Sequence, residues 1–283
     1  MNYTRNLEKT IDLWFEEDLR DGDHTTLSTI PPAASGSAVL LVKQEGVLAG
    51  VDIAMKIFDH FDPMLETELY LKDGDRIQPG MEAFRVKGLV HSILPCERLV
   101  LNVMQRMSGI ATATREYADM LEGTGTRILD TRKTTPGFRI LEKEAVRIGG
   151  GENHRFGLFD MILIKDNHVD FAGGIEAAIL GARRYLQEKS LDLMIEIEVR
   201  SLADIEKVLA QGGVHRILLD NFDPDDTRKA VQLIGGRYET ESSGGISKET
   251  LRQYAECGVD YISAGALTHQ ISSLDLSLKA EFK

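Results

Sequence analysis

Residues 161–220 read MILIKDNHVDFAGGIEAAILGARRYLQEKSLDLMIEIEVRSLADIEKVLAQGGVHRILLD. Short apolar runs such as MILI, IEIEV and ILL alternate there with stretches of helical periodicity such as LADIEKVLAQ. Such alternation is typical of parallel strands joined by crossover helices. This stretch therefore predicts βα units in a parallel α/β sheet or barrel.

The same rhythm continues on both sides of that stretch. We expect six strands, at residues 127–130, 161–165, 194–199, 217–220, 238–242 and 261–264. Six βα units are fewer than the eight of a complete (β/α)8 barrel. We therefore expect an α/β fold with an incomplete, distorted barrel of about six strands, and a doubly wound sheet is the alternative.

The first half of the chain has a different pattern. An amphipathic helix is expected over about the first 20 residues, with Leu7 and Ile11 on its apolar side. Apolar runs then alternate with turn pairs such as Asp73-Gly74, which indicates a small, mostly antiparallel β region with one helix near IAMKIFDHF. Residues 95–123 predict one or two helices, interrupted near Ser108-Gly109.

The composition is that of an acidic globular protein. The 283 residues carry a net charge of -12, with 42% hydrophobic and 28% charged residues. Non-specific nucleic-acid binding needs a basic face, so we expect no nucleic-acid partner. No run approaches the ~18 apolar residues of a membrane span, and the N-terminus lacks the apolar core of a signal peptide. We expect a soluble, cytoplasmic protein with no membrane partner.

Cys96 and Cys257 lie far apart and have no His or Cys neighbours at metal-ligand spacing. A disulfide framework or zinc site is therefore not expected. We predict that both are buried free thiols, in keeping with a reducing cytoplasm.

Every expected strand of the second half ends on polar or glycine-containing residues or carries them near its end. In α/β barrels the active site lies at these carboxyl ends. The segments are Asp130 to Thr135, Lys165 to His168, Glu196 and Glu198, Asp220-Asn221, Ser242 to Gly245, and Ala264 to Ala266. Their gathering on one rim predicts a functional site.

A basic segment interrupts the acidic chain. Residues 127–168 contain eight Lys or Arg and six Asp or Glu, a net charge of +2, which leaves -14 for the rest. The planar guanidinium group of Arg pairs with carboxylates and phosphates through two parallel hydrogen bonds, so this segment indicates a doubly anionic or phosphorylated ligand. We expect Arg139, Lys143 and Arg147, at helical spacing, to form a solvated helix face. That explanation does not cover Arg132, Lys133, His154, Arg155 and Lys165.

Acidic residues and glycines on the later strands complement the basic segment. Glu196 and Glu198 share one face of the run IEIEV, where they could hold Mg²⁺ through water or bind a ribose diol. An internal salt bridge to Lys or Arg is the alternative. The glycine-rich ends of two later strands allow backbone N–H groups to approach a phosphate.

One motif has a misleading form. Asp21-Gly22-Asp23-His24-Thr25 matches the DxDxT pattern of aspartyl-phosphate phosphatases, but it follows a polar helix end instead of an apolar strand. We expect it to form a turn and a helix cap.

Residues 130–169, DTRKTTPGFRILEKEAVRIGGGENHRFGLFDMILIKDNHV, resemble the signature of the quinolinate phosphoribosyltransferase family. The segments CERLVLNVMQRMSGIAT, EIEV, ILLDNF, ESSGGIS and GVDYISAGALTH match it further and follow in family order. The resemblance covers the chain from about residue 16 to the C-terminus.

The resemblance implies an enzyme that joins quinolinate to the anomeric carbon of 5-phosphoribosyl 1-pyrophosphate with Mg²⁺. Its products would be nicotinate mononucleotide, pyrophosphate and CO₂. The implied fold is an N-terminal α/β sandwich domain over residues 1–108 and a barrel over 109–271, with a terminal strand over 272–283 returning to the sandwich. A homodimer is the expected minimum.

The resemblance also implies roles for individual residues. Quinolinate would be held by Thr131, Arg132, His154, Arg155 and Lys165, with Arg98 entering from a neighbouring subunit. The phosphoribosyl substrate would be held by Lys133, Glu198, Asp220, Ser243, Gly244, Gly245, Ala264, Gly265 and Ala266. Glu198 and Asp220 would hold Mg²⁺, directly or through water molecules, and catalysis would fall to these two acids with Lys133 and Lys165.

Three other functions fit parts of the pattern. The first is transfer to nicotinate or another pyridine or azole acid. The second is a barrel aldolase or lyase in which a desolvated Lys165 forms a Schiff base. The third is a non-catalytic protein that binds a phosphorylated ligand.

Overall fold

The computed structural model describes residues 3–281 and divides into two compact units. Unit 1 contains the chain up to Ala113, then Thr135–Gly149, and the chain from Ile271 onward. Unit 2 contains Thr114–Thr134 and Gly150–Gln270. The division expected between residues 108 and 109 stays a prediction.

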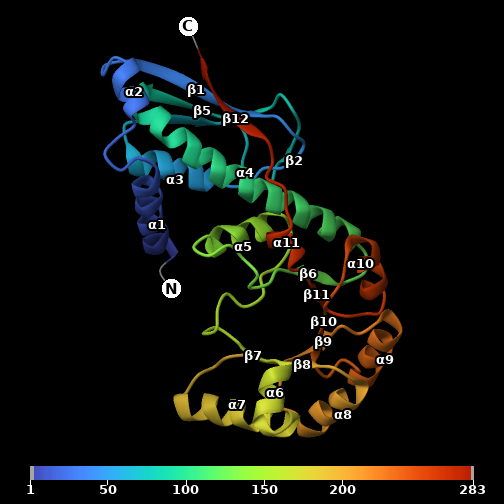
Figure 1. Cartoon of the computed structure of the whole chain (residues 1–283). Helices are drawn as coiled ribbons and strands as arrows, with labels where there is room; N and C mark the ends of the chain where they lie inside the picture. The colour runs from blue at the N-terminus through green and yellow to red at the C-terminus, as the bar shows by residue number, and fades with distance from the viewer. Residues whose placement is uncertain (1–2, 282–283) are drawn as a thin grey trace. The chain divides into compact units, whose positions relative to one another are not determined.

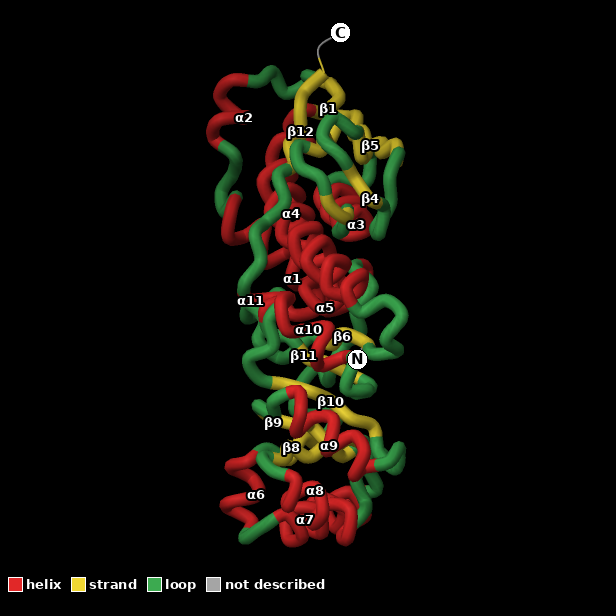
Figure 2. The backbone as a smooth tube through the Cα atoms, turned by 90° about the vertical axis from the view of Figure 1, so that its right-hand side faces the viewer, coloured by secondary structure: helices red, strands yellow, loops and turns green. Residues whose placement is uncertain are grey.

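Unit 1 is built on a four-stranded antiparallel sheet. Its strand order is β12 (Leu276–Glu281), β1 (Ser35–Val42), β5 (Glu82–Leu89) and β3 (Glu66–Leu69). The C-terminal strand therefore lies in the sheet formed by the N-terminal part of the chain, as Figure 2 shows for β1, β5 and β12. A separate pair joins β2 (Gly46–Val47) to β4 (Arg76–Ile77).

Five helices complete the described part of unit 1. They are α1 (Tyr3–Asp18), α2 (His24–Thr29), α3 (Val51–Phe61), α4 (Val90–Met120, which continues into unit 2) and α5 (Arg139–Ile148). Leu7 and Ile11 of α1 are buried, as the amphipathic pattern predicts. The Asp23 side chain accepts a hydrogen bond from the Thr26 backbone N–H as the N-cap of α2, which confirms the cap expected for the DxDxT segment.

The helix α4 is continuous, and the interruption expected near Ser108-Gly109 was a wrong prediction. Glycine is present there because of a close tertiary approach. A Cβ atom on Gly109 would lie 2.3 Å from the Ser272 carbonyl oxygen. The neighbouring Ser108 hydroxyl donates to the Ala49 carbonyl oxygen, so this turn of the helix packs against two other segments of unit 1.

Two helical glycines therefore give opposite predictions. We expect Gly109→Ala to destabilise the protein by about 1–3 kcal/mol, because the new methyl group overlaps backbone that cannot move freely. Gly181→Ala in α7 (Ile175–Lys189) meets nothing within 4 Å and should stabilise by about 0.5–1 kcal/mol. Chemical denaturation of both variants measures this difference. Equal stability of the two would contradict the packing explanation.

Unit 2 is built on a six-stranded parallel sheet. Its strand order is β6 (Arg127–Leu129), β11 (Tyr261–Ser263), β10 (Glu239–Ser243), β9 (Arg216–Asp220), β8 (Ile195–Val199) and β7 (Ile162–Ile164). From β7 to β11 each strand lies beside its predecessor in the chain, and the order never reverses as it does in a doubly wound sheet. The edges β6 and β7 are not paired with each other. The incomplete barrel expected from the sequence is confirmed.

Helices cover the outer side of this sheet, as Figure 1 shows for α7 to α10. The helices of this unit that follow its strands are α6 (Asp166–Ala172), α7, α8 (Leu202–Gln211), α9 (Pro224–Ile234), α10 (Lys248–Ala255) and the short α11 (Ala266–His269). Because all six strands are parallel, their carboxyl ends lie on one rim of the sheet. This rim carries the candidate site.

Two expectations about single residues have different outcomes. Cys96 and Cys257 are free and buried, as predicted.

The solvated helix face expected for α5 is a wrong prediction for Lys143. This residue is buried because α5 packs within unit 1. The neighbouring Glu142 is fully buried there and pairs with Arg106 at 2.9 Å. None of the helices in residues 3–281 combines the length and the apolar character that a membrane span requires.

Candidate active site

A pocket of about 650 Å³ lies at the carboxyl ends of the strands of unit 2. All the site residues expected from the sequence line it, except Arg98. These are Thr131, Arg132, Lys133, His154, Arg155, Lys165, Glu198, Asp220, Ser243, Gly244, Gly245, Ala264, Gly265 and Ala266. Arg98 belongs to unit 1, where it is exposed on α4. The expected residues of unit 2 thus converge from all six strand ends.

One side of the pocket is cationic. Burial lowers the pKa of the Arg155 guanidinium, and the positive charge of Arg132 lowers it further. Two guanidinium groups that repel each other in a partly buried site are stabilised by an anion between or beside them. This side of the pocket is therefore suited to a ligand with more than one negative charge.

Lys165 connects the cationic side to the acidic side. Its ammonium group lies 3.1 Å from the Glu198 carboxylate, and the Asp166 backbone N–H also reaches Glu198 at 3.4 Å. The salt bridge considered for the acids of IEIEV is thus present at Glu198. Lys165 remains half exposed while Glu198 is buried, so the lysine can also face a ligand in the pocket.

Asp220 lies near Glu198 at the end of the neighbouring strand. Burial raises the pKa of Asp220, and the negative charge of Glu198 raises it further. Two partly buried carboxylates that repel each other in this way fit a divalent cation, because oxygen ligands are those that Mg²⁺ prefers. The residues present are therefore compatible with a magnesium site.

The glycine-rich end of β10 requires backbone conformations that other residues rarely adopt. Gly244 and Gly245 have φ of +94° and +63°, and Asn221, beside them, has φ of +55°. A Cβ atom on Gly244 would lie 2.3 Å from the Asn221 side-chain oxygen. Successive N–H groups in such a loop form a concave site for an anion such as phosphate.

Several lining residues were not predicted as site residues. They are Leu163, Leu218, Glu241, Ile246, Ser263 and His269, whereas Asn221, which also lines the pocket, belongs to a strand end expected at the site. For two of them, the spacing in the sequence could have indicated a place at the site. Glu241 alternates with Ser243 on one face of its strand, and His269 follows Gly265 by one helical turn. A Cβ atom on Gly265 would lie 2.8 Å from His269 Nε2, so glycine permits that close approach.

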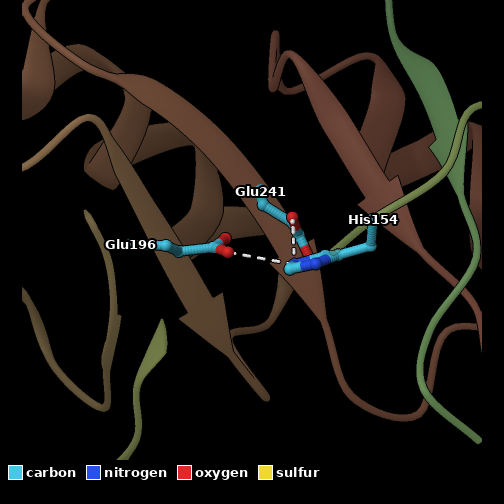
Figure 3. A group of neighbouring side chains, drawn as sticks. All are labelled: His154, Glu196 and Glu241. Carbon is cyan, nitrogen blue, oxygen red and sulfur yellow. Dashed lines mark ion pairs between the residues drawn. The ribbon is translucent and has the colours of Figure 1, made fainter. Parts of the chain in front are cut away.

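A buried cluster lies beside the cationic side, and Figure 3 shows Glu196 and Glu241 directed toward the ring of His154. His154 Nε2 lies 2.9 Å from Glu196 Oε2 and 3.5 Å from Glu241 Oε2. Burial and the charge of Glu196 raise the pKa of Glu241 to about 7. These three residues could offer metal ligands, but the Arg216 guanidinium lies 3.1 Å from Glu241 and already supplies a cation there.

Comparison with known proteins gives a consistent result. Residues 110–279 match the family model "Quinolinate phosphoribosyl transferase, C-terminal domain", and residues 23–108 match the corresponding N-terminal domain. The chain is 45% identical to the chloroplastic nicotinate-nucleotide pyrophosphorylase [carboxylating] of Arabidopsis thaliana, over 98% of this chain and 84% of the relative. It is 42% identical to a probable enzyme of that name from Bacillus subtilis, over 98% of this chain and 94% of the relative.

Solved structures of similar proteins agree with these sequence matches. The crystal structure of NadC from Streptococcus pyogenes has a TM-score of 0.93 and 38% identity, covering 98% of this chain and 97% of that one. The nicotinate-nucleotide pyrophosphorylase from Pyrococcus furiosus, at 16% identity and a TM-score of 0.66, shares the fold.

Proposed function

Because this chain belongs to the quinolinate phosphoribosyltransferase family, we propose that its pocket has a cationic half for quinolinate and an acidic, glycine-rich half for the phosphoribosyl substrate. The reaction is phosphoribosyl transfer to quinolinate with decarboxylation, which gives nicotinate mononucleotide in NAD biosynthesis. The proposal assigns that reaction to particular side chains.

The main support for the cationic half is the pair of guanidinium groups of Arg132 and Arg155, because the charge of Arg132 lowers the pKa of Arg155 in the pocket beyond the effect of burial. In the proposal these two groups bind the carboxylates of quinolinate, together with Lys165, Thr131 and His154. Guanidinium forks match carboxylates bidentately, which fixes the plane of the pyridine ring. A monocarboxylate such as nicotinate would leave part of this charge unpaired, which argues against the monocarboxylate alternative.

The other half of the pocket would bind 5-phosphoribosyl 1-pyrophosphate. The loops Ser243 to Gly245 and Ala264 to Ala266 offer backbone N–H groups for phosphate, and Lys133 adds a positive charge beside Gly265. Glu198 and Asp220 would hold Mg²⁺, directly or through water, or the ribose hydroxyl groups. Bound there, Mg²⁺ would neutralise charge on the pyrophosphate group.

The reaction follows from this arrangement. As the bond from the anomeric carbon to pyrophosphate breaks, the ribose becomes oxocarbenium-like, and a nearby Glu198 carboxylate stabilises that positive charge. Lys133 stabilises the leaving pyrophosphate. The cationic half holds the quinolinate nitrogen in line with the anomeric carbon, where the new C–N bond forms. The carboxylate next to the now positive nitrogen leaves as CO₂, and the ring carbon takes a proton.

A Schiff-base lyase is less consistent with the site. A lysine used in that way has to be uncharged, which requires a desolvated position or a neighbouring cation. Lys165 is half exposed, so its position is not desolvated, and it forms a salt bridge of 3.1 Å with the Glu198 carboxylate. Borohydride trapping of a carbonyl substrate is expected to leave the protein unmodified.

The assembly and location remain proposals. We propose a homodimer or larger homo-oligomer in which Arg98 enters the neighbouring subunit's pocket, and the exposure of Arg98 on α4 supports this. We also propose a cytoplasmic location, which two free, buried cysteines support.

A glycine substitution tests the division of the pocket. Gly244→Ala places a methyl group against Asn221 and distorts the phosphate loop, so KM for 5-phosphoribosyl 1-pyrophosphate should rise about tenfold while KM for quinolinate changes less than about twofold. The matched control is Gly258→Ala, since Gly258 has a similar φ of +88° but does not line the pocket. Steady-state kinetics measure both. An equal rise in both KM values for Gly244→Ala would contradict the proposed halves.

A further inference from the structure

Two carboxylates beside the cationic half carry buried oxygen atoms that lack hydrogen-bond partners. These atoms are Oε1 of Glu196 and Oε1 of Glu241, and neither side chain is exposed. A buried carboxylate oxygen without a hydrogen bond is costly, and native proteins keep few of them. Such a group therefore calls for an explanation beyond packing.

All three nitrogen atoms of the neighbouring His154 have a polar contact. Its backbone N–H donates to the fully buried Asp130 carboxylate at 2.8 Å. Its ring Nδ1 accepts from the Arg155 backbone N–H at 2.6 Å. Its ring Nε2 lies 2.9 Å from Glu196 Oε2. Since Nδ1 accepts a hydrogen bond, the ring carries its proton on Nε2, facing the carboxylate.

These contacts form a continuous connection from the barrel interior to the pocket. Glu196 on β8 holds the His154 ring, and that ring in turn holds the backbone of Arg155, whose guanidinium lines the pocket. The guanidinium of Arg155 itself donates a hydrogen bond of 3.4 Å to the Met161 carbonyl oxygen. The backbone of Arg155 and the direction of its side chain therefore depend on the orientation of the His154 ring.

We propose that Glu196 is a positioning residue for dicarboxylate binding, which acts by fixing the His154 ring and, through its Nδ1 atom, the backbone of Arg155. This inference rests on the cationic half proposed above. It also refines the role of His154, whose two ring nitrogens are engaged by Arg155 and Glu196, so that the ring acts on quinolinate mainly through Arg155.

A purely structural role would give Glu196 a different partner. Arg216 is the buried cation of this part of the barrel, and it contacts Glu241 at 3.1 Å and Glu239 at 2.9 Å. It also lies over the Tyr261 ring at 4.0 Å. Burial raises the pKa of Glu196, and the charge of Arg216 opposes that rise, so Arg216 also acts on Glu196 through space. The carboxylates that Arg216 contacts directly are Glu239 and Glu241, whereas the ion-pair contact of Glu196 is with His154. Glu239 accordingly provides a control carboxylate on the same sheet that pairs with Arg216 without contact to His154, and its side chain is 40% exposed.

The test compares Glu196→Gln, Glu196→Ala and Glu239→Gln. The probe is benzene-1,2-dicarboxylate, which has two adjacent carboxylates but no ring nitrogen, so its binding is measured without turnover. We expect its Kd and the KM for quinolinate to rise about fivefold or more in Glu196→Gln and about tenfold or more in Glu196→Ala. The KM for 5-phosphoribosyl 1-pyrophosphate should stay within about twofold, and Glu239→Gln should leave all three constants within about twofold.

Parallel rises in both KM values, or an equal effect of Glu239→Gln, would overturn the inference, because a general loss of barrel structure moves all these constants together. Arg155→Ala separates this inference from the proposed function. If Arg155→Ala weakens benzene-1,2-dicarboxylate binding and Glu196→Ala does not, only the positioning role is wrong. If neither variant weakens it, the cationic half is wrong as well. In the double variant Arg155→Ala/Glu196→Ala, the Kd for benzene-1,2-dicarboxylate should rise by less than the product of the two single-variant increases, since both substitutions act through Arg155.

Discussion

Arg155→Ala is expected to lower kcat/KM for quinolinate about a hundredfold or more. The guanidinium lies in a pocket where burial and Arg132 lower its pKa, so it gains strongly from a bound carboxylate. A bidentate carboxylate contact makes two charge-assisted hydrogen bonds, each worth about 1.5–3 kcal/mol. Most of the loss should fall on KM for quinolinate, because the contact is made in the ground state as well as in the transition state.

Arg127→Ala is the control for that prediction. Arg127 lies in the same unit, at the start of β6, and is half exposed. It pairs with Glu152 at 2.9 Å and lies over the Tyr261 ring at 4.3 Å, so it resembles Arg155 in charge but not in position. Its removal should change kcat/KM less than about twofold. Similar losses in the two variants would show that net charge, and not the position of Arg155, determines binding.

Glu198→Gln is expected to lower kcat about a hundredfold to a thousandfold, with little change in KM for quinolinate. The carboxylate is buried at the end of β8, beside Asp220 and within 3.1 Å of Lys165. Its charge is needed most when the ribose becomes positively charged, and preorganised groups of this kind are worth about 10²–10³ in rate. The Mg²⁺ concentration for half-maximal rate should also rise, since one carboxylate of the proposed metal site is neutral in the variant.

The matched variant for Glu198 is Glu152→Gln. Glu152 is a half-exposed carboxylate of the same unit that pairs with Arg127, so its loss should leave kcat and the Mg²⁺ requirement unchanged. Initial rates at saturating concentrations of both substrates, measured over a range of Mg²⁺ concentrations, test both variants. Full kcat in Glu198→Gln would contradict the proposed role of this carboxylate.

The parallel sheet could be predicted from the sequence because each strand is a short apolar run followed by polar or glycine residues. For β8 the run IEIEV is completely buried, and the two glutamates do not obscure the pattern. The same local signals misled us in α4. Gly109 looks like a helix interruption, yet its lack of a side chain serves an approach to Ser272, a contact that no local pattern contains.

The candidate site was predicted where its chemistry shows in residue type and order, and missed where it depends on tertiary contacts. Lys165 needed an anionic partner, but only the fold shows that Glu198 supplies it. Lys143 looks like part of a solvated helix face, although packing within unit 1 buries it. The link from Glu196 through His154 to Arg155 joins residues more than 40 positions apart, so the sequence could not show it.

The most direct test of the divided pocket is to measure pyrophosphate and CO₂ release together, from quinolinate and from nicotinate, with and without Mg²⁺. With quinolinate and 5-phosphoribosyl 1-pyrophosphate, we expect equal amounts of the two products, and only when Mg²⁺ is present. With nicotinate, release of pyrophosphate should be slower by about a hundredfold or more, because half of the cationic site lacks its carboxylate. Equally fast pyrophosphate release from nicotinate, or none from quinolinate, would contradict a pocket built for a dicarboxylate and a phosphoribosyl donor.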